Sequence, residues 1–452
     1  MRMTLPDTVR SLLDSYGEFE QALSVVNMES ELRELVRFNG NKALPIHRWF
    51  VFKEGFSAGL LFHVCERASV DIGRVRAVLD PFAGVGTSLV DLQLNYVGED
   101  PIDIVGIEYN PLIAFVAKAK TRWPEYGRKA IQEHIEPLLV KFRPDELNSQ
   151  QIPSLSSLRN RLVFRSQTVR QLLALRGRIM TQLSELPERD FFLLAWLSII
   201  DTVSGVRKDG RALRYTDNSA APPVLHALAS QLQLMLDDLA GVSETVSRAK
   251  KVRCHVIRSD GRVAAARPSP DGKFDLVYYS PPYPNNIDYS EVYKLELWLS
   301  RHVGSVNEFR KLRLGTLRSH PSVKFPETRD MEGLPVTSWA ARLRRLLLDS
   351  VPKDRYLTAR RRTIGGYLDD MYRAIRSQFD CVRPGAPVII VIGNSMHGRP
   401  EHPVPIAADL LLSSIAMAVG FDVERIEIAR NLRRRANGIK YLRESVLFLR
   451  RP

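Results

Sequence analysis

The stretch Val78-Leu79-Asp80-Pro81-Phe82-Ala83-Gly84-Val85-Gly86-Thr87 decides the fold of this chain. It starts as the end of an apolar strand, predicted over 75–80, and continues as a turn with two glycines. Glycine lacks a Cβ atom, so a ligand can approach the backbone of such a turn closely. A helix predicted over 88–95 and a second strand over 104–108 follow. Strand, glycine turn, helix and strand in this order open a doubly wound α/β sheet.

A glutamate at the end of the second strand makes the pattern more specific. Glu108 lies about 20 residues beyond the turn, where an acid in a doubly wound sheet accepts hydrogen bonds from ribose hydroxyls. A dinucleotide site prefers a third glycine, which lets the helix pack closely and cradle a pyrophosphate. Leu89 occupies that position, so the pattern disfavours a nicotinamide cofactor. The alternative is a tight turn followed by an ordinary surface glutamate.

Strand and helix patterns continue to the C-terminus with two interruptions. Helical patterns dominate the first, with helices predicted over 170–186, 191–203 and 224–239, whereas Gly, Pro and Ser make the second loop-rich. Outside them we predict strands over 252–257, 274–280, 387–392, 421–429 and 444–449, and helices over 365–379 and 406–419. The predicted parts are an N-terminal helical cap (1–44), a cofactor-binding part (45–118), a helical insertion (119–251), a catalytic part (252–300), a basic insertion (301–362) and a C-terminal part (363–452).

The charge of the chain suits a polyanionic partner. Its 65 Lys and Arg exceed its 51 Asp and Glu, which gives a formal net charge of +14. The basic insertion alone holds fifteen Lys or Arg and six Asp or Glu, so the excess is concentrated rather than spread evenly. This concentration favours nucleic acid over the alternative of an indifferent basic surface.

Several classes of protein are disfavoured by what the sequence lacks. The three cysteines are far apart and form no Cys-x-x-Cys pair, so we expect neither a disulfide framework nor a metal site. The N-terminus shows no signal-peptide pattern, and the longest apolar run, 191–200, is too short to cross a bilayer. We therefore expect a cytoplasmic protein without a membrane segment.

A second motif follows the strand predicted over 274–280. Ser280-Pro281-Pro282-Tyr283 stands at its carboxyl end, the edge at which open α/β sheets bind ligands. Successive prolines fix φ and remove backbone donors, so the loop is stiff and its carbonyls are free to accept hydrogen bonds. A Pro-Pro-Tyr recognition motif for an aromatic groove is the alternative, but such motifs favour disordered tails rather than apolar strands.

The two motifs together resemble those of the amino-group DNA methyltransferases. The glycine turn matches their Asp-Pro-Phe-x-Gly-x-Gly-Thr motif, and the resemblance extends through Ser280 to Asn285 and Asp288-Tyr289, within about 46–450. It implies a Rossmann-like class I methyltransferase fold with a mostly parallel seven-stranded sheet, and S-adenosyl-L-methionine as cofactor. The cofactor-binding residues it implies are Asp80, Pro81, Phe82, Gly84, Gly86 and Thr87 in the turn, Glu108 and Asn110 after the second strand, Asp260 near the adenine, and Arg48 and Trp49 in a segment that closes over the methionine end.

The resemblance also implies a catalytic role for Ser280, Pro281, Pro282 and Tyr283. An exocyclic amine is a poor nucleophile because its lone pair is delocalised into the ring, so a site must accept its N–H protons. The Ser280 hydroxyl and the Pro281 carbonyl are candidate acceptors, and Tyr283 is expected to stack on a base swung out of the duplex. Holding the amine and the methyl group in line supplies the catalysis, with no metal and no covalent intermediate.

The first residue of this loop bears on the target base. Within the family a serine there resembles the cytosine-N4 branch, whereas adenine-N6 enzymes usually have Asp or Asn. Methylation of a cytosine ring carbon needs a cysteine nucleophile after a proline, and the sequence has no Pro-Cys pair. We therefore expect N4-methylation of cytosine, with adenine-N6 methylation as an alternative.

Two cationic regions are candidates for contacting nucleic acid. The segment 206–215 gathers four cations beside glycine and tyrosine, and the basic insertion is a second candidate clamp on the phosphate backbone. A solvated charged loop is the plain alternative for each region. The candidate contacts are Arg207, Lys208, Arg211, Arg214, Arg310, Lys311 and Arg313, followed by Arg318, Arg342, Arg344 and Arg345. Arg433 to Arg435 and Leu442 to Ser445 resemble the final hairpin of the family.

The expected partner is double-stranded DNA, together with a cognate restriction or defence protein. Two other classes stay open. One is a methyltransferase for structured RNA, although the sequence offers no obvious appended RNA-binding domain. The other is a non-catalytic DNA-binding subunit of a defence system.

Overall fold

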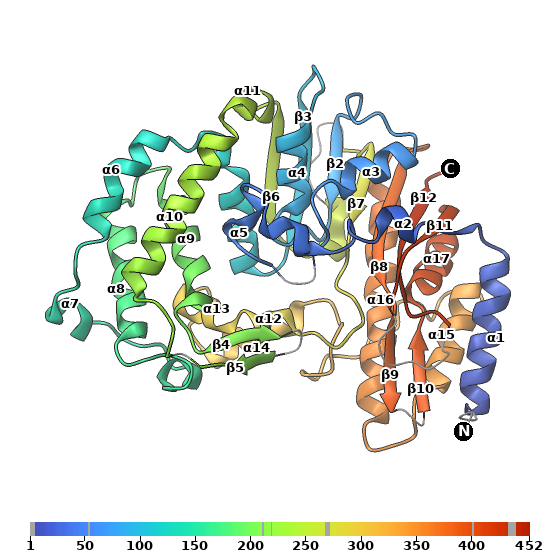
Figure 1. Ribbon diagram of the computed structural model, residues 1–452. Helices are drawn as coiled ribbons and strands as arrows, with labels where there is room; N and C mark the ends of the chain where they lie inside the picture. The colour runs from blue at the N-terminus through green and yellow to red at the C-terminus, as the bar shows by residue number, and fades with distance from the viewer. Residues whose placement is uncertain are drawn as a thin grey trace.

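An eight-stranded sheet in the order β1-β11-β12-β8-β7-β2-β3-β6 forms the centre of the computed structural model (Figure 1). The structure describes residues 5–52, 55–209, 212–217, 219–266, 272–399, 402–432 and 440–452. The strands of the sheet are β1 (Val25–Asn27), β2 (Ala77–Asp80), β3 (Ile102–Glu108), β6 (Val252–Arg258), β7 (Leu276–Tyr279), β8 (Pro387–Gly393), β11 (Asp422–Asn431) and β12 (Arg443–Arg450).

The directions of the strands agree with the predicted α/β fold. Strands β6, β3, β2, β7 and β8 run parallel, and β12 pairs antiparallel with both β8 and β11. The sheet has one strand more than the seven predicted, because β1 pairs in parallel with β11 at the edge. Strand β1 lies inside the predicted helical cap. Its three residues are too few to show the alternation of apolar and polar side chains that predicts a strand.

Helices cover both faces of the sheet, and strand β8 shows how the sequence divides them. Val388, Ile390 and Ile392 belong to a core with one group of helices, whereas Ile389 and Val391 face the other side. This alternation is the period of two expected for a strand buried on both faces. The first face carries α1 (Asp7–Gln21), α15 (Trp339–Asp349), α16 (Leu357–Cys381) and α17 (Ala408–Val419), and the second carries α3 (Leu60–Arg67) and α4 (Thr87–Asn95).

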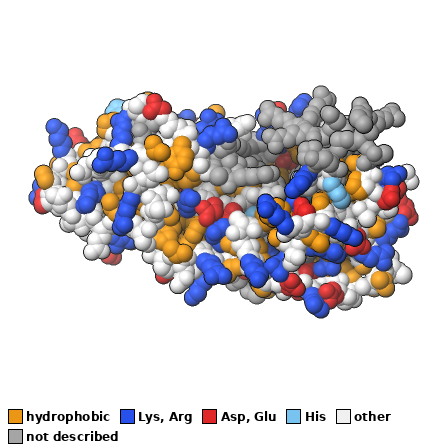
Figure 2. Space-filling model, turned by 90° about the horizontal axis from the view of Figure 1, so that it is seen from below, with side chains coloured by type: hydrophobic (Ala, Val, Ile, Leu, Met, Phe, Trp, Pro, Cys, Tyr) orange, Lys and Arg blue, Asp and Glu red, His pale blue; other side chains and the backbone are white. Residues whose placement is uncertain are grey.

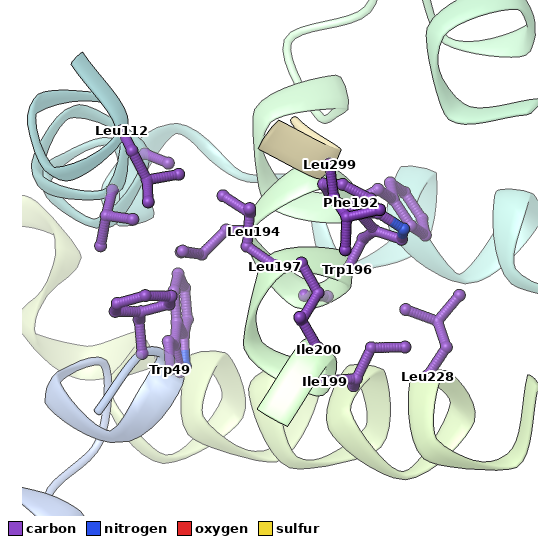
Figure 3. Packing of buried hydrophobic residues seen from close by; sticks show 14 of the residues in the cluster. Trp49, Leu112, Phe192, Leu194, Trp196, Leu197, Ile199, Ile200, Leu228 and Leu299 are labelled. Atoms are coloured by element: carbon purple, nitrogen blue, oxygen red, sulfur yellow. The ribbon is translucent and has the colours of Figure 1, made fainter. Parts of the chain in front are cut away.

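The helical insertion forms a third body of helices beyond α5 (Pro111–Thr121), at the left of Figure 1. The three helices predicted there are confirmed with shifts of a few residues at their ends. Helix α9 is buried among the others (Figure 3). Its Trp196 donates a hydrogen bond to the Leu172 carbonyl at 2.9 Å. The helices of this region are α6 (Arg128–Leu138), α7 (Pro144–Asn148), α8 (Thr168–Gln182), α9 (Arg189–Thr202), α10 (Val224–Gly241) and α11 (Val246–Ala249).

Two hairpins and several helices lie where the sequence predicted neither a helix nor a strand. Hairpin β4 (Val206–Asp209) and β5 (Ala212–Tyr215) follows α9, and hairpin β9 (Ser395–Arg399) and β10 (His402–Ile406) follows β8. The basic insertion is more helical than predicted, because its charged residues lie on the outer faces of amphipathic helices. Helices α14 (Val306–Gly315), α15 and the first turns of α16 belong to it, and α12 (Tyr289–Val292) and α13 (Lys294–Leu299) precede it.

Candidate active site

A cavity of about 900 Å³ lies at the carboxyl ends of β2, β3, β6 and β7. Because these four strands are parallel, the residues that follow each of them meet at one edge of the sheet. The cavity therefore unites the two motifs that the sequence separates by about two hundred residues. Its walls include Pro81, Phe82, Gly84, Glu108, Asn110, Asp260, Ser280, Pro281 and Pro282 from the predicted site, and Phe52, Tyr109, Arg262, Tyr289, Thr316, Ser319 and His320 in addition.

The glycine turn takes a conformation that side chains rarely adopt. Gly84 has φ 52° and Gly86 has φ 79°, both in the left-handed region. A Cβ atom on Gly86 would lie 3.3 Å from the Cβ of Ala117, so the turn also packs tightly on α5. Asp80 is buried beneath the turn, where it accepts hydrogen bonds from the Phe82 amide (3.1 Å) and the Ser88 hydroxyl. The structure thus places Asp80 as a support of the turn.

Glu108 is the acid of the cavity wall. One oxygen of its carboxylate accepts a hydrogen bond from the Asn110 amide at 2.7 Å. Burial raises the pKa of Glu108 to about 7, although backbone donors from Asn110, Gly84 and Tyr109 oppose that rise. Asn110 caps α5, since its side chain accepts a hydrogen bond from the Leu112 amide at 3.0 Å. A fixed carboxylate at this point fits the hydroxyls of a ribose.

Asp260 lines the cavity but is held by an arginine. Arg262 donates from Nε to Asp260 at 2.9 Å, from Nη1 to Asp370 on α16 at 2.7 Å, and from Nη2 to the Gly315 carbonyl at 3.0 Å. One guanidinium thus connects the loop after β6, helix α16 and the end of α14. Nothing in the sequence marked Arg262, apart from its place two residues beyond Asp260.

The loop of residues 280–283 contains a chain of hydrogen bonds that ends on a carboxylate. Tyr283 donates its only hydroxyl proton to Glu444 on β12 at 2.9 Å, and Arg430 binds the same carboxylate at 2.8 Å. The Tyr283 oxygen can then accept the Ser280 proton across 3.4 Å. This direction leaves the lone pairs of Ser280 Oγ as acceptors at the cavity wall.

The position of Tyr283 differs from the expectation that it stacks on a base. Its side chain lines a separate hollow with Arg37, Arg430 and Glu444, and not the main cavity. A Cβ atom on Gly393 would approach its ring to 2.6 Å, so the absence of a side chain at Gly393 makes room for the ring. The prediction assigned stacking to the ring, whereas the structure fixes the hydroxyl between Ser280 and Glu444.

The β9–β10 hairpin supports the loop from the other side. The Ser395 hydroxyl donates to the Pro284 carbonyl at 2.6 Å, and His397 Nε2 lies 2.7 Å from the same oxygen. Both side chains belong to β9, which runs on from β8 beside β7. The hairpin therefore fixes the backbone just beyond the two prolines.

His320 is a cavity residue that the sequence did not suggest. Ser322 donates its proton to Asp288 at 2.8 Å, because the carboxylate of Asp288 is paired with Arg313 and can only accept. His320 Nδ1, 2.6 Å from the Ser322 oxygen, is therefore the protonated nitrogen, and Nε2 is an acceptor. Nε2 is buried and has no hydrogen-bond partner among the described residues.

Arg48 and Trp49, expected at the methionine end of the cofactor, lie against α10. Arg48 Nε donates to Asp238 at 3.0 Å, and Trp49 Nε1 donates to the same carboxylate at 3.0 Å. Neither side chain lines the main cavity or the smaller cavity next to it. Their neighbour His47 lines the smaller cavity, together with Thr87 of the glycine turn.

Lys208 is unsuited to the predicted contact with nucleic acid. Its ammonium group is buried and binds the carboxylates of Glu296 on α13 and Asp201 on α9. Burial alone would lower the pKa of Lys208, but these carboxylates raise it. The ammonium also lies 4.4 Å from the centre of the Tyr293 ring. Lys208 thus joins the β4–β5 hairpin to α9 and α13.

The other cationic candidates fall into three groups. Arg207, Arg214, Arg310, Lys311 and Arg345 are exposed. Arg313, Arg318, Arg342 and Arg344 form ion pairs with Asp288, Asp370, Glu18 and Asp369 respectively. Arg211 and Arg433 to Arg435 lie outside the described residues. Figure 2 views the molecule from below Figure 1, and it shows many Lys and Arg side chains on the face that carries α14 and the β4–β5 hairpin.

The described part of the chain offers neither a membrane-spanning helix nor a cluster of metal ligands. No helix there is both long and apolar enough to cross a membrane. No three His, Cys, Asp or Glu side chains are grouped there so that they could hold a metal ion.

The strand order, the glycine turn and the cavity define an α/β protein with a Rossmann-like methyltransferase fold. The chain is 25% identical over 441 residues to the type II methyltransferase M.BsoBI of Geobacillus stearothermophilus, a match that covers 88% of this chain and 82% of that protein. It is 26% identical over 467 residues to the type II methyltransferase M.AvaI of Nostoc sp., covering 94% and 90%. The chain is thus similar to two type II methyltransferases over most of its length.

Other comparisons add little. No family model matches the chain. A solved structure of a proposed DNA modification methylase from Thermus thermophilus is 24% identical, but the match covers 20% of this chain and 38% of that one with a TM-score of 0.17. The same methylase complexed with S-adenosyl-L-methionine gives 22% identity and a TM-score of 0.18. Structural matches with such low TM-scores support no conclusion about this chain.

Proposed function

We propose that this protein is a DNA methyltransferase that moves a methyl group from S-adenosyl-L-methionine to the exocyclic N4 amine of a cytosine swung out of the duplex. One observation carries the proposal: a single cavity brings the glycine turn and Glu108 together with the Ser280 loop. The homologous type II methyltransferases support the transfer of a methyl group to DNA. The choice of N4 of cytosine as the methylated atom rests on Ser280, because the names of the two relatives do not specify that atom.

The residues of the cavity fit the cofactor. Gly84 allows close approach to the backbone, Glu108 offers a carboxylate to ribose hydroxyls, and Asp260 lies beyond it for the adenine end. When bound, S-adenosyl-L-methionine supplies an electrophilic methyl group on a sulfonium. The ring of Phe52 stacks on Tyr289 and Tyr293, with ring centroids 6.0 and 5.4 Å apart, and so closes one side of the site.

The chain contributes acceptors for the target amine. Ser280 Oγ keeps its lone pairs available because its own proton is directed to Tyr283. The Pro281 carbonyl is a second acceptor, and His320 Nε2 offers a third on the same cavity. Acceptors on the N–H protons draw electron density back to the nitrogen, and a stiff Pro-Pro loop holds the amine in line with the methyl group.

The natural partner that we propose is double-stranded DNA in the cytoplasm, with a cognate restriction or defence protein acting on the same sites. Exposed Arg207, Arg310 and Lys311 would contact the phosphate backbone beside the cavity.

The test uses purified full-length protein, tritiated S-adenosyl-L-methionine and either duplex DNA or RNA, followed by digestion to nucleosides. We expect the label in N4-methylcytosine from duplex DNA. Ser280→Ala should abolish transfer and leave the Kd of the cofactor unchanged. Label in N6-methyladenine would replace the proposed base, label only in RNA would replace the proposed polymer, and cofactor binding without transfer would indicate a non-catalytic subunit.

A further inference from the structure

His320 differs from the acidic side chains of the main cavity because its basic atom is not in use. Glu108 accepts a hydrogen bond from the Asn110 amide at 2.7 Å, and Asp260 accepts one from Arg262 at 2.9 Å. His320 is 2% exposed, and its Nε2 atom is buried without a hydrogen-bond partner among the described residues. A buried acceptor without a partner on the wall of a cavity indicates a donor that a substrate would bring.

Three neighbours fix the tautomer of this histidine. Asp288 receives the Ser322 proton, and Arg313 Nη2 donates to the Ser322 oxygen at 2.9 Å. The remaining lone pair of that oxygen lies 2.6 Å from His320 Nδ1 and therefore binds a proton on that nitrogen. Nδ1 also lies 3.5 Å from the Asp288 carboxylate. The neutral ring thus keeps the lone pair of Nε2, and Asp288 would stabilise the ring once Nε2 is protonated.

The residue before His320 is joined to the segment that continues from the Pro-Pro loop. The Asn286 amide donates to the Ser319 carbonyl at 3.1 Å, and the Ser319 hydroxyl donates to the Ile287 carbonyl at 3.2 Å. The Phe325 ring packs edge-on against the imidazole, with centroids 5.3 Å apart. These contacts connect His320 to the loop that would hold the target amine.

We propose that His320 Nε2 takes the proton that the target amine loses when it is methylated, with Ser322 and Asp288 as positioning residues. The inference rests on the proposed function and deepens it. As the amine nitrogen bonds to the methyl carbon, the electron pair of the carbon–sulfur bond stays on sulfur, and the nitrogen becomes a cation with two hydrogens. One N–H bond then breaks: its electron pair remains on nitrogen and its proton goes to Nε2. The imidazolium returns this proton to water after the products leave.

The other acceptors proposed for the amine are too weakly basic for this step. The Ser280 hydroxyl and the Pro281 carbonyl can accept a hydrogen bond, but neither holds a proton at neutral pH. Imidazole can, because its ordinary pKa lies near neutrality. Ser280 and Pro281 would therefore orient the amine, and His320 would remove its proton.

The charged groups around His320 come from two helices. Asp288 and Glu291 lie at the start of α12, and both pair with Arg313 of α14. Burial lowers the pKa of His320 and Arg313 adds to this change, whereas Asp288 and Glu291 oppose it. Only the neutral ring can take a proton. At saturating cofactor and DNA, kcat should therefore fall as pH decreases through a pKa below the ordinary value of histidine.

Steady-state kinetics of His320→Gln test the proton transfer. Glutamine is close to histidine in size, and its amide can accept a hydrogen bond but cannot take a proton. We expect kcat at pH 8 to fall about 100-fold, as for the loss of a general base, and the decrease at low pH to disappear. The Kd of the cofactor should stay the same.

Chemical rescue separates proton transfer from a structural role. His320→Ala leaves space for a free base, so added imidazole should raise its kcat about tenfold or more and should not affect His320→Gln. Nitrogen NMR gives a readout without turnover. The free wild type should show a ring with the proton on Nδ1 at pH 8, and this signal should be absent in His320→Gln. In Ser322→Ala the preference for this tautomer should weaken.

The matched control is His302→Gln. Ser300 Oγ lies 2.7 Å from His302 Nδ1, so this histidine has a similar serine contact, but it is not part of the described wall of the main cavity. Its kcat should equal that of the wild type. A His320→Gln variant with full kcat, or a His320→Ala variant that binds the cofactor but gains nothing from imidazole, would overturn this inference alone. A wild type that transfers no methyl group to DNA would overturn the proposed function as well.

Discussion

The hydroxyl of Tyr283 sets the direction of the hydrogen bonds in the proposed catalytic loop. Its proton goes to Glu444, so the Ser280 proton goes to Tyr283 and the Ser280 lone pairs face the cavity. Tyr283→Phe keeps the ring but removes the hydroxyl that accepts the Ser280 proton. We expect kcat to fall about tenfold, which corresponds to the loss of about one hydrogen bond. The Kd of the cofactor should not change.

Steady-state kinetics with duplex DNA check this prediction, with Tyr356→Phe as the control because Tyr356 is 44% exposed. A role in base stacking predicts the opposite result. In that case Tyr283→Phe would keep full activity, since phenylalanine stacks as well as tyrosine does.

The carboxyl group of Glu108 makes cofactor binding dependent on pH. Burial raises its pKa to about 7, so the carboxylate that ribose hydroxyls need is lost as pH falls below that value. We expect the Kd of the cofactor to increase about tenfold between pH 8 and pH 6. Glu108→Gln should bind weakly at every pH and show a flatter dependence. Calorimetry across this range measures both.

The same raised pKa has an opposite consequence for stability. The folded-state pKa lies above the unfolded value, so the charged form opposes folding, and the contribution of Glu108 falls as pH rises from below 4.5 to above 7. Glu108→Gln should therefore have a higher Tm than the wild type at pH 8, and the gain should shrink at pH 5. A lower Tm for the variant at pH 8 would contradict this account.

The β4–β5 hairpin gives a prediction at the level of one element, because two neighbouring cations on it have different environments. Lys208 is buried between Glu296 and Asp201, whereas Arg207 is exposed. Lys208→Met leaves Glu296 buried without its partner, which costs about 3–5 kcal/mol of the free energy of unfolding. Arg207→Met should leave stability unchanged within about 0.5 kcal/mol. Denaturant unfolding of the two variants measures the difference.

DNA binding should distinguish the variants Arg207→Met and Lys208→Met in the opposite way from stability. Arg207→Met should weaken DNA binding, whereas any loss in Lys208→Met should follow its loss of folded protein. A stable Lys208→Met variant with weakened DNA binding would restore the original interpretation of Lys208 as a phosphate contact.

Strands and helices with a strong periodicity of apolar residues were predictable from the sequence, whereas elements held by tertiary contacts were not. Each of the seven predicted strands appears, because apolar runs such as 387–392 are buried on both faces. Strand β1 was missed because its three residues pair with β11, which is remote in sequence. The β9–β10 hairpin was missed because its strands are short and β10 contains two prolines. The residues of the site followed the same rule. Motif spacing indicated Glu108 and Ser280, but His320 is marked only by its burial and by its Nε2 atom, which has no hydrogen-bond partner among the described residues.

At the scale of the whole molecule, parts that are distant in sequence meet on one side of the sheet. The carboxyl ends of four parallel strands, the β4–β5 hairpin and α14 share that side (Figure 1), and it carries many Lys and Arg side chains (Figure 2). Arg207 comes from the helical insertion, whereas Arg310 and Lys311 come from the basic insertion. If both insertions contact one duplex, their cations should act together on DNA binding.

Salt dependence of DNA affinity tests this arrangement. Each phosphate contact contributes about −0.9 to the slope of log K against log salt concentration. Replacing Arg207, Arg310 and Lys311 with methionine should therefore weaken binding at low salt and reduce the magnitude of the slope by about 2.7. Cofactor affinity should stay the same, since none of the three lines the cavity. Arg74→Met is the control, because Arg74 is exposed at the opposite ends of the strands, just before β2. An unchanged slope in the triple variant would place the DNA on another face.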